Sequence, residues 1–187
     1  MSNNTNNTAL LVMDMQNAML STFSEGAAVT ANVAKAIANA RSKGIPVIYV
    51  VVGFRQGAPE ISANNKVFIE NKARFSNVNF TDFTAIHPDL APQAHEPVVV
   101  KRRFSAFTGS DLEVLLRGLR VDHLVLTGIV TSGVVLSTLR EAADKDFRIT
   151  VLSDGCADRE ADVHEFLMTK IFPRQAEVRT IEEWNKA

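Results

Sequence analysis

The stretch DHLVLTGIVTSGVVLSTLR, from Asp122 to Arg140, decides the fold of this chain. Its first part, residues 124–126, is a short apolar run typical of a buried strand. The chain then turns at Thr127-Gly128, and a helix follows that Thr131 or Ser132 can cap. In an open α/β sheet such a turn lies at the carboxyl end of a strand, where free N–H groups suit an anion or a developing negative charge. A purely structural joint has the same pattern, so both interpretations stay open here.

Apolar runs that indicate buried strands alternate with helical periodicity along the whole chain. Strands are expected at residues 9–13, 47–52, 98–100, 124–126 and 149–152, with an edge strand at Val178; helices are expected at 29–43, 111–117, 131–145 and 162–172. This alternation predicts an α/β fold with a doubly wound sheet, a Rossmann-like three-layer α/β/α sandwich. Residues 53–97 are the least regular part, with one short helix expected near 63–68. A long insertion of this kind is often a lid or an oligomer contact.

Composition predicts a single globular domain. The 187 residues suffice to bury a full core, and 46% hydrophobic with 22% charged residues fits a soluble protein. Residues 1–8 are expected to be a disordered tail, and residues 9–187 one domain. A formal net charge of -1 gives no sign of a nucleic-acid or membrane partner, and the basic run 101–103 is too small for a duplex. We also expect a cytoplasmic location, because the start lacks signal-peptide features and the single Cys156 excludes an internal disulfide.

Three strand ends carry the residues with chemical potential. Asp14 ends the first expected strand, Lys101 ends the third, and the turn at 128–134 ends the fourth. If these ends meet, a carboxylate and an ammonium group share one pocket. The pairing lowers the pKa of the aspartate while burial raises it. Such a pair suits acid–base chemistry, and it also suits a structural ion pair under a loop.

Four segments resemble the isochorismatase-like (cysteine hydrolase) superfamily, which includes nicotinamidases, carbamoylases and isochorismatases. They are LLVMDMQN at residues 10–17, VVKRRFSAF at 99–107, TGIVTSGVV at 127–135 and VLSDGCAD at 151–158. Their order matches the family, and the resemblance covers nearly the whole chain. It implies a six-stranded, mainly parallel sheet and a homo-oligomer, either a dimer or a tetramer.

The resemblance also assigns roles by position. Asp14 would be the general acid/base and Lys101 its charged partner. A cis peptide bond is implied before Thr131, between Val130 and Thr131. Backbone N–H groups around Gly133 and the residue after it would face the substrate oxygen.

The third catalytic position departs from the hydrolytic members, which carry a nucleophilic cysteine there. This chain has Val134, and a valine cannot attack a carbonyl group, so thioester chemistry is excluded at this position. Cys156 belongs to the next strand and is interpreted as a small buried thiol. Residues 51–57 hold no histidine, so the nicotinamidase-type metal site is not expected, and no Gly-x-Gly-x-x-Gly motif follows the first strand. We therefore expect neither a metal nor a nucleotide cofactor.

Isochorismatases also lack this cysteine, usually with glycine in its place, and cleave a vinyl ether by acid catalysis. An Asp14/Lys101 pair could do the same, although Val134 narrows the pocket. The sequence therefore predicts an isochorismatase-like hydrolase of a small metabolite, which uses acid/base chemistry without a cysteine nucleophile. The alternative is a catalytically silent binding or assembly protein on the same scaffold. The sequence does not identify the substrate.

Further residues are expected to bind the substrate. They are Gln16, Phe107, Val130, Thr131 and Gly133, and Phe104 is an equal candidate with Phe107 for the pocket wall. Gln16 could instead bond to the backbone, and both phenylalanines could instead pack in the core. His123 is expected on the surface, and His164 is expected to be exposed on its helix.

Overall fold

The computed structural model describes residues 7–186 of the chain. Its strands are β1 (Thr8–Met13), β2 (Val47–Val52), β3 (Val98–Lys101), β4 (His123–Ile129), β5 (Arg148–Ala157) and β6 (Glu177–Arg179). Its α-helices are α1 (Asn17–Leu20), α2 (Gly26–Ser42), α3 (Lys66–Glu70), α4 (Lys72–Ser76), α5 (Phe80–Thr84), α6 (Leu112–Gly118), α7 (Leu136–Asp144), α8 (Ala161–Phe166) and α9 (Ile181–Lys186). Shorter helical turns are η2 (Pro88–Leu90), η3 (Thr131–Val135), η4 (Leu167–Ile171) and η5 (Phe172–Arg174).

The six strands form one sheet in the order β3-β2-β1-β4-β5-β6, and every neighbouring pair is parallel. From β1 the chain builds outward to β3 on one side and from β4 to β6 on the other. The order therefore reverses between β1 and β4, which is where open α/β sheets bind their ligands. The predicted doubly wound fold is confirmed.

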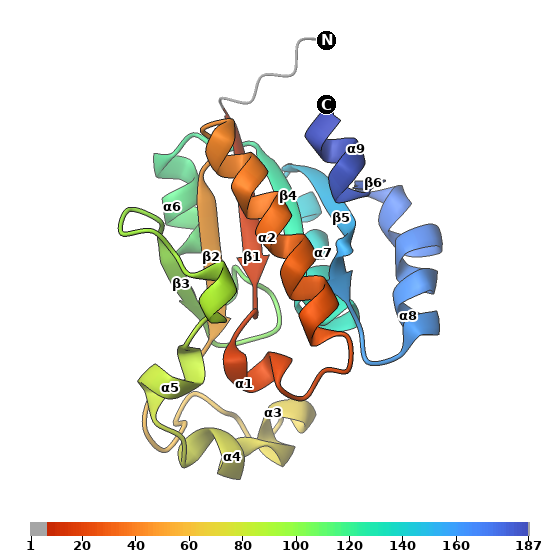
Figure 1. The fold of residues 1–187 in the computed structure, drawn as a ribbon. Helices are drawn as coiled ribbons and strands as arrows, with labels where there is room; N and C mark the ends of the chain where they lie inside the picture. The colour runs from red at the N-terminus through yellow and green to blue at the C-terminus, as the bar shows by residue number, and fades with distance from the viewer. Residues whose placement is uncertain (1–6, 187) are drawn as a thin grey trace.

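Two hydrophobic cores lie on the two faces of the sheet. Leu10 and Val12 of β1 pack with α2 and α9, whereas Leu11 and Met13 pack with α6 and α7. Figure 1 shows α2 crossing the front of the sheet, with α6 and α7 behind it. All residues of β1 are buried, because helices cover both faces. Each fully buried Leu or Val contributes about 1.5–3 kcal/mol, so the central strand is firmly held.

The largest departure from the sequence-based expectation is the insertion between β2 and β3. Residues 53–97 contain three short helices, α3, α4 and α5, rather than the single helix expected at 63–68. They lie below the carboxyl ends of the strands in Figure 1. A third, smaller hydrophobic cluster around Phe54, Phe68 and Phe83 holds them together. The phenylalanines of this cluster are not spaced with helical periodicity in the sequence. The hydrophobic pattern therefore did not predict these helices.

The start of the helix after β4 also differs from expectation. Residues Thr131–Val135 form a π-helical turn before α7, and its N-cap residue, Val130, makes no capping bond with its side chain. The predicted cap by Thr131 or Ser132 is wrong. Instead, the backbone N–H of Ser132 donates to the Asp158 carboxylate at 2.6 Å. The acceptor comes from the end of β5, which a local sequence pattern does not reveal.

Most of the expected tail, residues 1–6, lies outside the described part of the chain. Thr8, which was expected to belong to it, is the first residue of β1. The Asn7 carbonyl accepts a hydrogen bond from the Asp122 backbone N–H at 2.9 Å. In residues 7–186, no helix combines the length and apolar character needed to cross a membrane.

Candidate active site

Asp14 and Lys101 form a buried ion pair at the carboxyl end of the sheet. Asp14 follows β1 directly, with a positive φ of 57°, and Lys101 is the last residue of β3. The Lys101 Nζ lies 2.9 Å from Asp14 Oδ2, and the two side chains are 2% and 9% exposed. The strands are not neighbours, since β2 lies between them. The long lysine side chain therefore reaches across the end of β2.

The environment of Asp14 shifts the pKa of its carboxyl group. Burial raises the pKa of the carboxyl group, and the nearby Lys101 ammonium lowers it only in part, so that the pKa lies above its usual value. Lys101 also donates to the Arg103 carbonyl at 2.9 Å, which fixes the position of its head group. Asp14 Oδ1 is buried and has no hydrogen-bond partner among the described residues. This oxygen is available to a bound molecule.

A cavity of about 340 Å³ opens onto this pair. Its lining is mainly apolar, with a few charged groups. It is lined by Asp14, Met19, Phe23, Val52, Val67, Phe68, Asn71, Arg74, Phe75, Lys101, Phe104, Ile129, Val130, Gly133, Val134 and Arg159. The Asp14/Lys101 pair is buried, whereas Arg74 and Arg159 are exposed. A small ligand would thus meet a buried carboxyl group and, nearer the solvent, guanidinium groups.

Gly128 allows β1 and β4 to approach each other at the switch point. Its φ is +132°, and a Cβ atom placed there would lie 2.0 Å from the Met13 carbonyl oxygen. Only glycine fits this position. Because Met13 precedes Asp14, the same close approach sets the distance between the acid and the turn after β4.

The turn after β4 contains one cis peptide bond, which joins Ile129 and Val130. The bond expected between Val130 and Thr131 is therefore wrong by one position, because β4 ends at Ile129 and the chain bends there. The Gly133 N–H donates to the Val130 carbonyl at 3.1 Å within the turn. This donor was expected to face the substrate oxygen, and the structure instead uses it to hold the turn.

The expected substrate-binding residues fall into two groups. Val130, Gly133 and Val134 line the cavity beside Asp14. Gln16 is fully buried and does not line it. Its amide oxygen accepts from the Val52 N–H at 2.9 Å, and its nitrogen donates to the carbonyl oxygens of Val52 and Phe83. The backbone-bonding role of Gln16 is the one that the structure shows, because it ties β2 to the insertion.

Phe107 and Thr131 lie away from the cavity. The Phe107 ring packs in the core against Phe147, with centroids 5.9 Å apart, whereas Phe104 lines the cavity. Thr131 is fully buried, and its hydroxyl is bonded to Nδ1 of His164 at 2.8 Å. His164 is half-buried rather than exposed, because α8 packs against this turn. The expected roles of Phe107 and Thr131 in substrate binding depended on which side of a loop each side chain occupies. The spacing of residues in the sequence does not determine that side.

Several cavity residues were missed in the sequence. Phe23 follows α1, Phe68 and Phe75 come from the insertion, and Arg74 and Arg159 are at the mouth. The one available signal was the density of phenylalanine in residues 54–83. Nothing in the sequence pointed to Arg159, because it lies just beyond the family-like segment at residues 151–158.

Cys156 has the character of a buried thiol. Burial raises its pKa to about 12, and its Sγ lies 3.9 Å from the Leu126 carbonyl oxygen. It is not among the residues that line the cavity. In the described range 7–186, no group of three or more His, Cys, Asp or Glu side chains is placed to hold a metal ion.

Comparison with known proteins gives the family. The model of the isochorismatase domain matches residues 8–183. The isochorismatase family protein YecD of Escherichia coli O157:H7 is 33% identical over 96% of this chain and 95% of its own length. The ureidoacrylate amidohydrolase RutB of Serratia proteamaculans is 34% identical over 79% of this chain and 68% of its own length. The chain belongs to the isochorismatase family, and the named enzymes among these relatives are hydrolases.

Solved structures agree with this result. An isochorismatase family protein from Burkholderia thailandensis has a TM-score of 0.84 and 29% identity, covering 96% of this chain and 94% of its own. A cysteine hydrolase from Pseudomonas syringae pv. phaseolicola has a TM-score of 0.88 at 24% identity, covering 98% and 92%. The second likeness shows the shared fold.

Proposed function

We propose that this protein hydrolyses a small metabolite by acid/base catalysis, with Asp14 as the acid/base and Lys101 as its charged partner. The reaction would use neither a cysteine nucleophile nor a metal or nucleotide cofactor. The observation that carries the proposal is Asp14 itself, which lines the cavity and whose buried Oδ1 has no hydrogen-bond partner among the described residues. A polar atom left without a partner in a folded core costs stability, so it is expected to have a role.

Hydrolysis of a vinyl ether fits these groups. Neutral Asp14 donates its proton to the enol carbon of the substrate, and the ether oxygen becomes part of an oxocarbenium ion. Water then adds to the carbon of this ion, and its proton returns to the Asp14 carboxylate. The resulting hemiketal breaks into a carbonyl compound and an alcohol. No covalent intermediate with the enzyme is formed.

The raised pKa of Asp14 supports the first step. Burial keeps a larger share of the carboxyl group protonated near neutral pH than for an exposed aspartate. Lys101 then stabilises the carboxylate that remains after proton transfer. A structural ion pair alone would not require that the aspartate line a cavity.

The cavity indicates the shape of the substrate. Its phenylalanine side chains, including Phe68, Phe75 and Phe104, suit an apolar or unsaturated body. Arg74 and Arg159 at the mouth suit a carboxylate on that body. We propose a small unsaturated carboxylate that spans the cavity from these arginines to Asp14.

The second candidate function is a catalytically silent binding protein on the same scaffold. Val134 favours this function. It lines the cavity at the position where, according to the family resemblance, the hydrolytic members carry cysteine. The side chain is 2% exposed and packs in the core cluster behind the cavity. A silent protein would bind a similar ligand and leave it unchanged.

The deciding experiment is a turnover panel with isochorismate, nicotinamide and N-carbamoyl amino acids. Wild type, Asp14→Asn and Val134→Cys are compared, with Asp89→Asn as a control at an exposed carboxylate. We expect wild type and Asp89→Asn to cleave the vinyl ether, and Asp14→Asn to lose at least about 10²–10³-fold in rate with an unchanged circular dichroism spectrum. An unchanged rate in Asp14→Asn contradicts the role of Asp14. Amide cleavage gained only in Val134→Cys would support a silent protein whose site remains intact.

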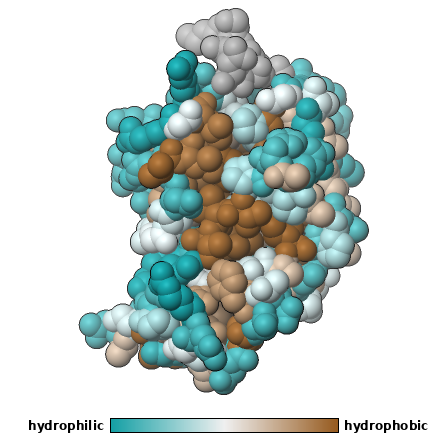
Figure 2. All heavy atoms as spheres, turned by 90° about the vertical axis from the view of Figure 1, so that its left-hand side faces the viewer, coloured by the Kyte–Doolittle hydropathy of each residue, from teal (hydrophilic) through white to brown (hydrophobic). Residues whose placement is uncertain are grey.

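We also propose that the protein is a homo-oligomer. Figure 2 shows a broad apolar area on the face that carries α6, β3 and α5. Val114, Val98 and Phe80 on these elements are 75%, 46% and 44% exposed. Because β3 is an edge strand, a second copy on this face would also cover its free edge. Light scattering after size exclusion is expected to show a dimer or tetramer that Val114→Lys dissociates, while Phe166→Lys on α8 leaves it intact.

The remaining expectations concern surroundings. A small-molecule substrate agrees with the cavity volume of about 340 Å³. We propose no nucleic-acid partner. A cytoplasmic location stays a prediction from the sequence.

A further inference from the structure

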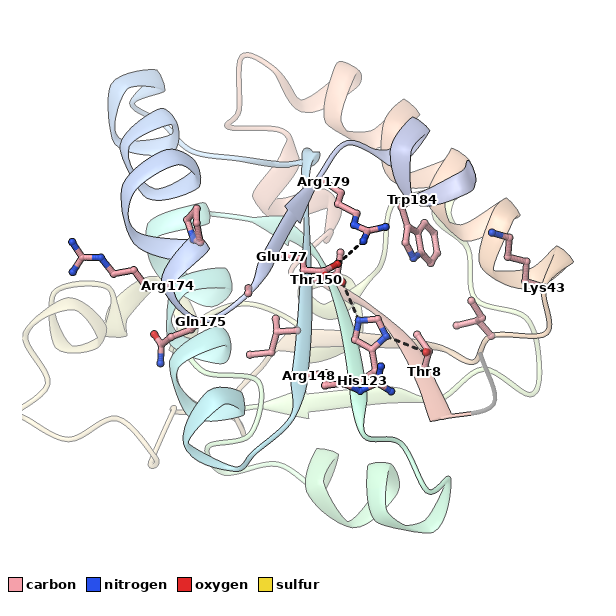
Figure 3. A pocket seen from close by; sticks show the side chains of 14 residues that line it. Thr8, Lys43, His123, Arg148, Thr150, Arg174, Gln175, Glu177, Arg179 and Trp184 are labelled. Carbon is pink, nitrogen blue, oxygen red and sulfur yellow. Dashed lines mark hydrogen bonds and ion pairs between the residues drawn. The ribbon is translucent and has the colours of Figure 1, made fainter. Parts of the chain in front are cut away.

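A second cleft lies at the opposite end of the sheet from Asp14. It has a volume of about 540 Å³ and borders the amino ends of β4, β5 and β6. Figure 3 shows its side chains, which come from the strands, the end of α2, residues 173–176 before β6, and α9. Its size suits a small metabolite. The residues that line it differ entirely from those of the Asp14 cavity.

The floor of the cleft is a row of polar side chains on neighbouring strands. His123 of β4 contacts the Thr8 hydroxyl through Nδ1 at 3.1 Å and the Thr150 hydroxyl through Nε2 at 2.9 Å. Figure 3 shows this row running from β1 to β5. His123 was expected on the surface, and it is instead half-buried. A row of hydrogen-bonded polar side chains on the floor of a cleft suits a polar ligand better than apolar packing.

The rim of the cleft carries four cationic side chains, Lys43, Arg148, Arg174 and Arg179, and one carboxylate, Glu177. Positive charge is therefore concentrated on this rim, although the whole chain has a formal net charge of -1. Arg174 points away from the others in Figure 3. Lys43 donates to the Asn185 carbonyl at 3.1 Å. Burial is the main cause that lowers the pKa of His123, and Arg148 and Arg179 lower it further, so these two cations lie nearest the His123 row.

The ion pairs on this rim are easily exchanged. Arg148 contacts Asp122 at 2.6 Å, with side chains 62% and 55% exposed, and Arg179 contacts Glu177 at 2.7 Å, with side chains 36% and 64% exposed. Exposed pairs of this kind contribute little to stability. A ligand anion can therefore replace a carboxylate partner at small cost, and a guanidinium group binds phosphate or carboxylate oxygens in a bidentate manner.

The apolar part of the lining limits the kind of anion. Ile45, Ile149 and Trp184 belong to the lining, where the cores leave 5%, 5% and 7% of them exposed. In Figure 3 the Trp184 indole is drawn near the Arg179 side chain. A flat ring would contact these exposed parts of the apolar lining, whereas a bare inorganic ion would not.

We propose that this cleft is a second ligand site, which binds a small metabolite with a flat ring and an oxygen anion held by Arg148 and Arg179. The anion is a phosphate or a carboxylate, since the same guanidinium groups recognise both. The site stands apart from the proposed chemistry at Asp14, and it does not depend on that proposal.

The test is calorimetric titration of the full chain at low ionic strength with AMP, benzoate, adenosine and inorganic phosphate. We expect AMP or benzoate to bind saturably, and adenosine and inorganic phosphate to bind at least about tenfold more weakly. Binding of AMP alone identifies a phosphate ligand. Benzoate also fits the ligand proposed for the Asp14 cavity, so its binding identifies a carboxylate ligand of this cleft only where Arg148→Gln and Arg179→Gln weaken it.

Variants locate the site. Arg148→Gln and Arg179→Gln are each expected to weaken binding about tenfold, whereas Arg117→Gln, an exposed arginine on α6 that also pairs with a carboxylate, leaves it unchanged. Asp14→Asn is also expected to leave it unchanged. The proposal is overturned if neither AMP nor benzoate binds saturably, or if binding persists undiminished in both Arg148→Gln and Arg179→Gln. Circular dichroism of each variant verifies the fold.

Discussion

The two ends of the sheet carry cavities of opposite character. At the carboxyl end, charge is buried: Asp14 and Lys101 are almost inaccessible, and one carboxylate oxygen has no partner among the described residues. At the amino end, charge is exposed, and the half-buried His123 has both ring nitrogens bonded. Burial without full hydrogen bonding perturbs proton affinity and so supports chemistry. Exposed cations around a satisfied floor support binding without chemistry.

The backbone should show the largest difference between the two ends. Gly128→Ala is expected to cost about 3 kcal/mol of unfolding free energy, because its Cβ atom would meet the Met13 carbonyl oxygen at 2.0 Å. Gly44→Ala is the matched control, since Gly44 also has a positive φ but no atom within 4 Å of a Cβ. It should cost only about 1 kcal/mol. Urea denaturation measures both, and equal losses would mean that the close approach of β1 and β4 is not a constraint.

The pH profile of activity should report on Asp14. The proposed reaction needs the protonated carboxyl group, so the rate should fall as the pH rises through the raised pKa of Asp14. Lys101 lowers that pKa, and Lys101→Gln should therefore move the fall in rate to higher pH while reducing the maximal rate about 10²-fold. Steady-state rates between pH 4 and 9 test this. A fall that moves to lower pH would contradict the pairing.

Stability at acidic pH should report on the other end. Burial is the main cause that lowers the pKa of His123 in the folded state. The unfolded chain then binds more protons below the usual histidine pKa of about 6.5, so stability is lost as the pH falls from there through the folded pKa. His123→Gln should reduce this loss between pH 7 and 5. His164, whose pKa burial also lowers, contributes its own share, and His164→Gln serves as the comparison. Thermal unfolding at several pH values measures both, and an unchanged slope in His123→Gln would contradict its neutral state.

The smallest effect is expected at the single cysteine. Cys156 is buried with a pKa of about 12, so native wild type should not react with a thiol reagent at pH 8, and Cys156→Ala should keep full activity. Val134→Cys should add one thiol that reacts in the native state, because Val134 lines the cavity. Labelling with iodoacetamide followed by mass spectrometry counts these thiols. Rapid labelling of native wild type would show that Cys156 is accessible.

The sequence predicted the sheet well because continuous apolar runs mark strands that are buried on both faces. The bounds of β2 agree with expectation, and Asp14 and Lys101 were found because they end such runs. The exact partners of loop residues were not predictable. Gln16 has local neighbours but bonds to Val52 and Phe83, which fold onto it from 36 and 67 residues away. Phe104 and Phe107 are alike in the sequence and differ only in the side of the loop that they occupy.

The acid of the site and part of its cavity lining come from different parts of the chain. Asp14 and Lys101 lie at the ends of β1 and β3 and Val134 lies in η3, whereas Phe68, Arg74 and Phe75 come from one continuous insertion between β2 and β3. That insertion is attached to the rest of the fold partly through the Gln16 side chain. Under the proposed function, the insertion is therefore expected to carry one share of the substrate preference in a continuous segment that does not contain the acid. Replacing residues 54–84 with the matching segment of a relative is expected to alter selectivity in one step while Asp14 and Lys101 stay in place.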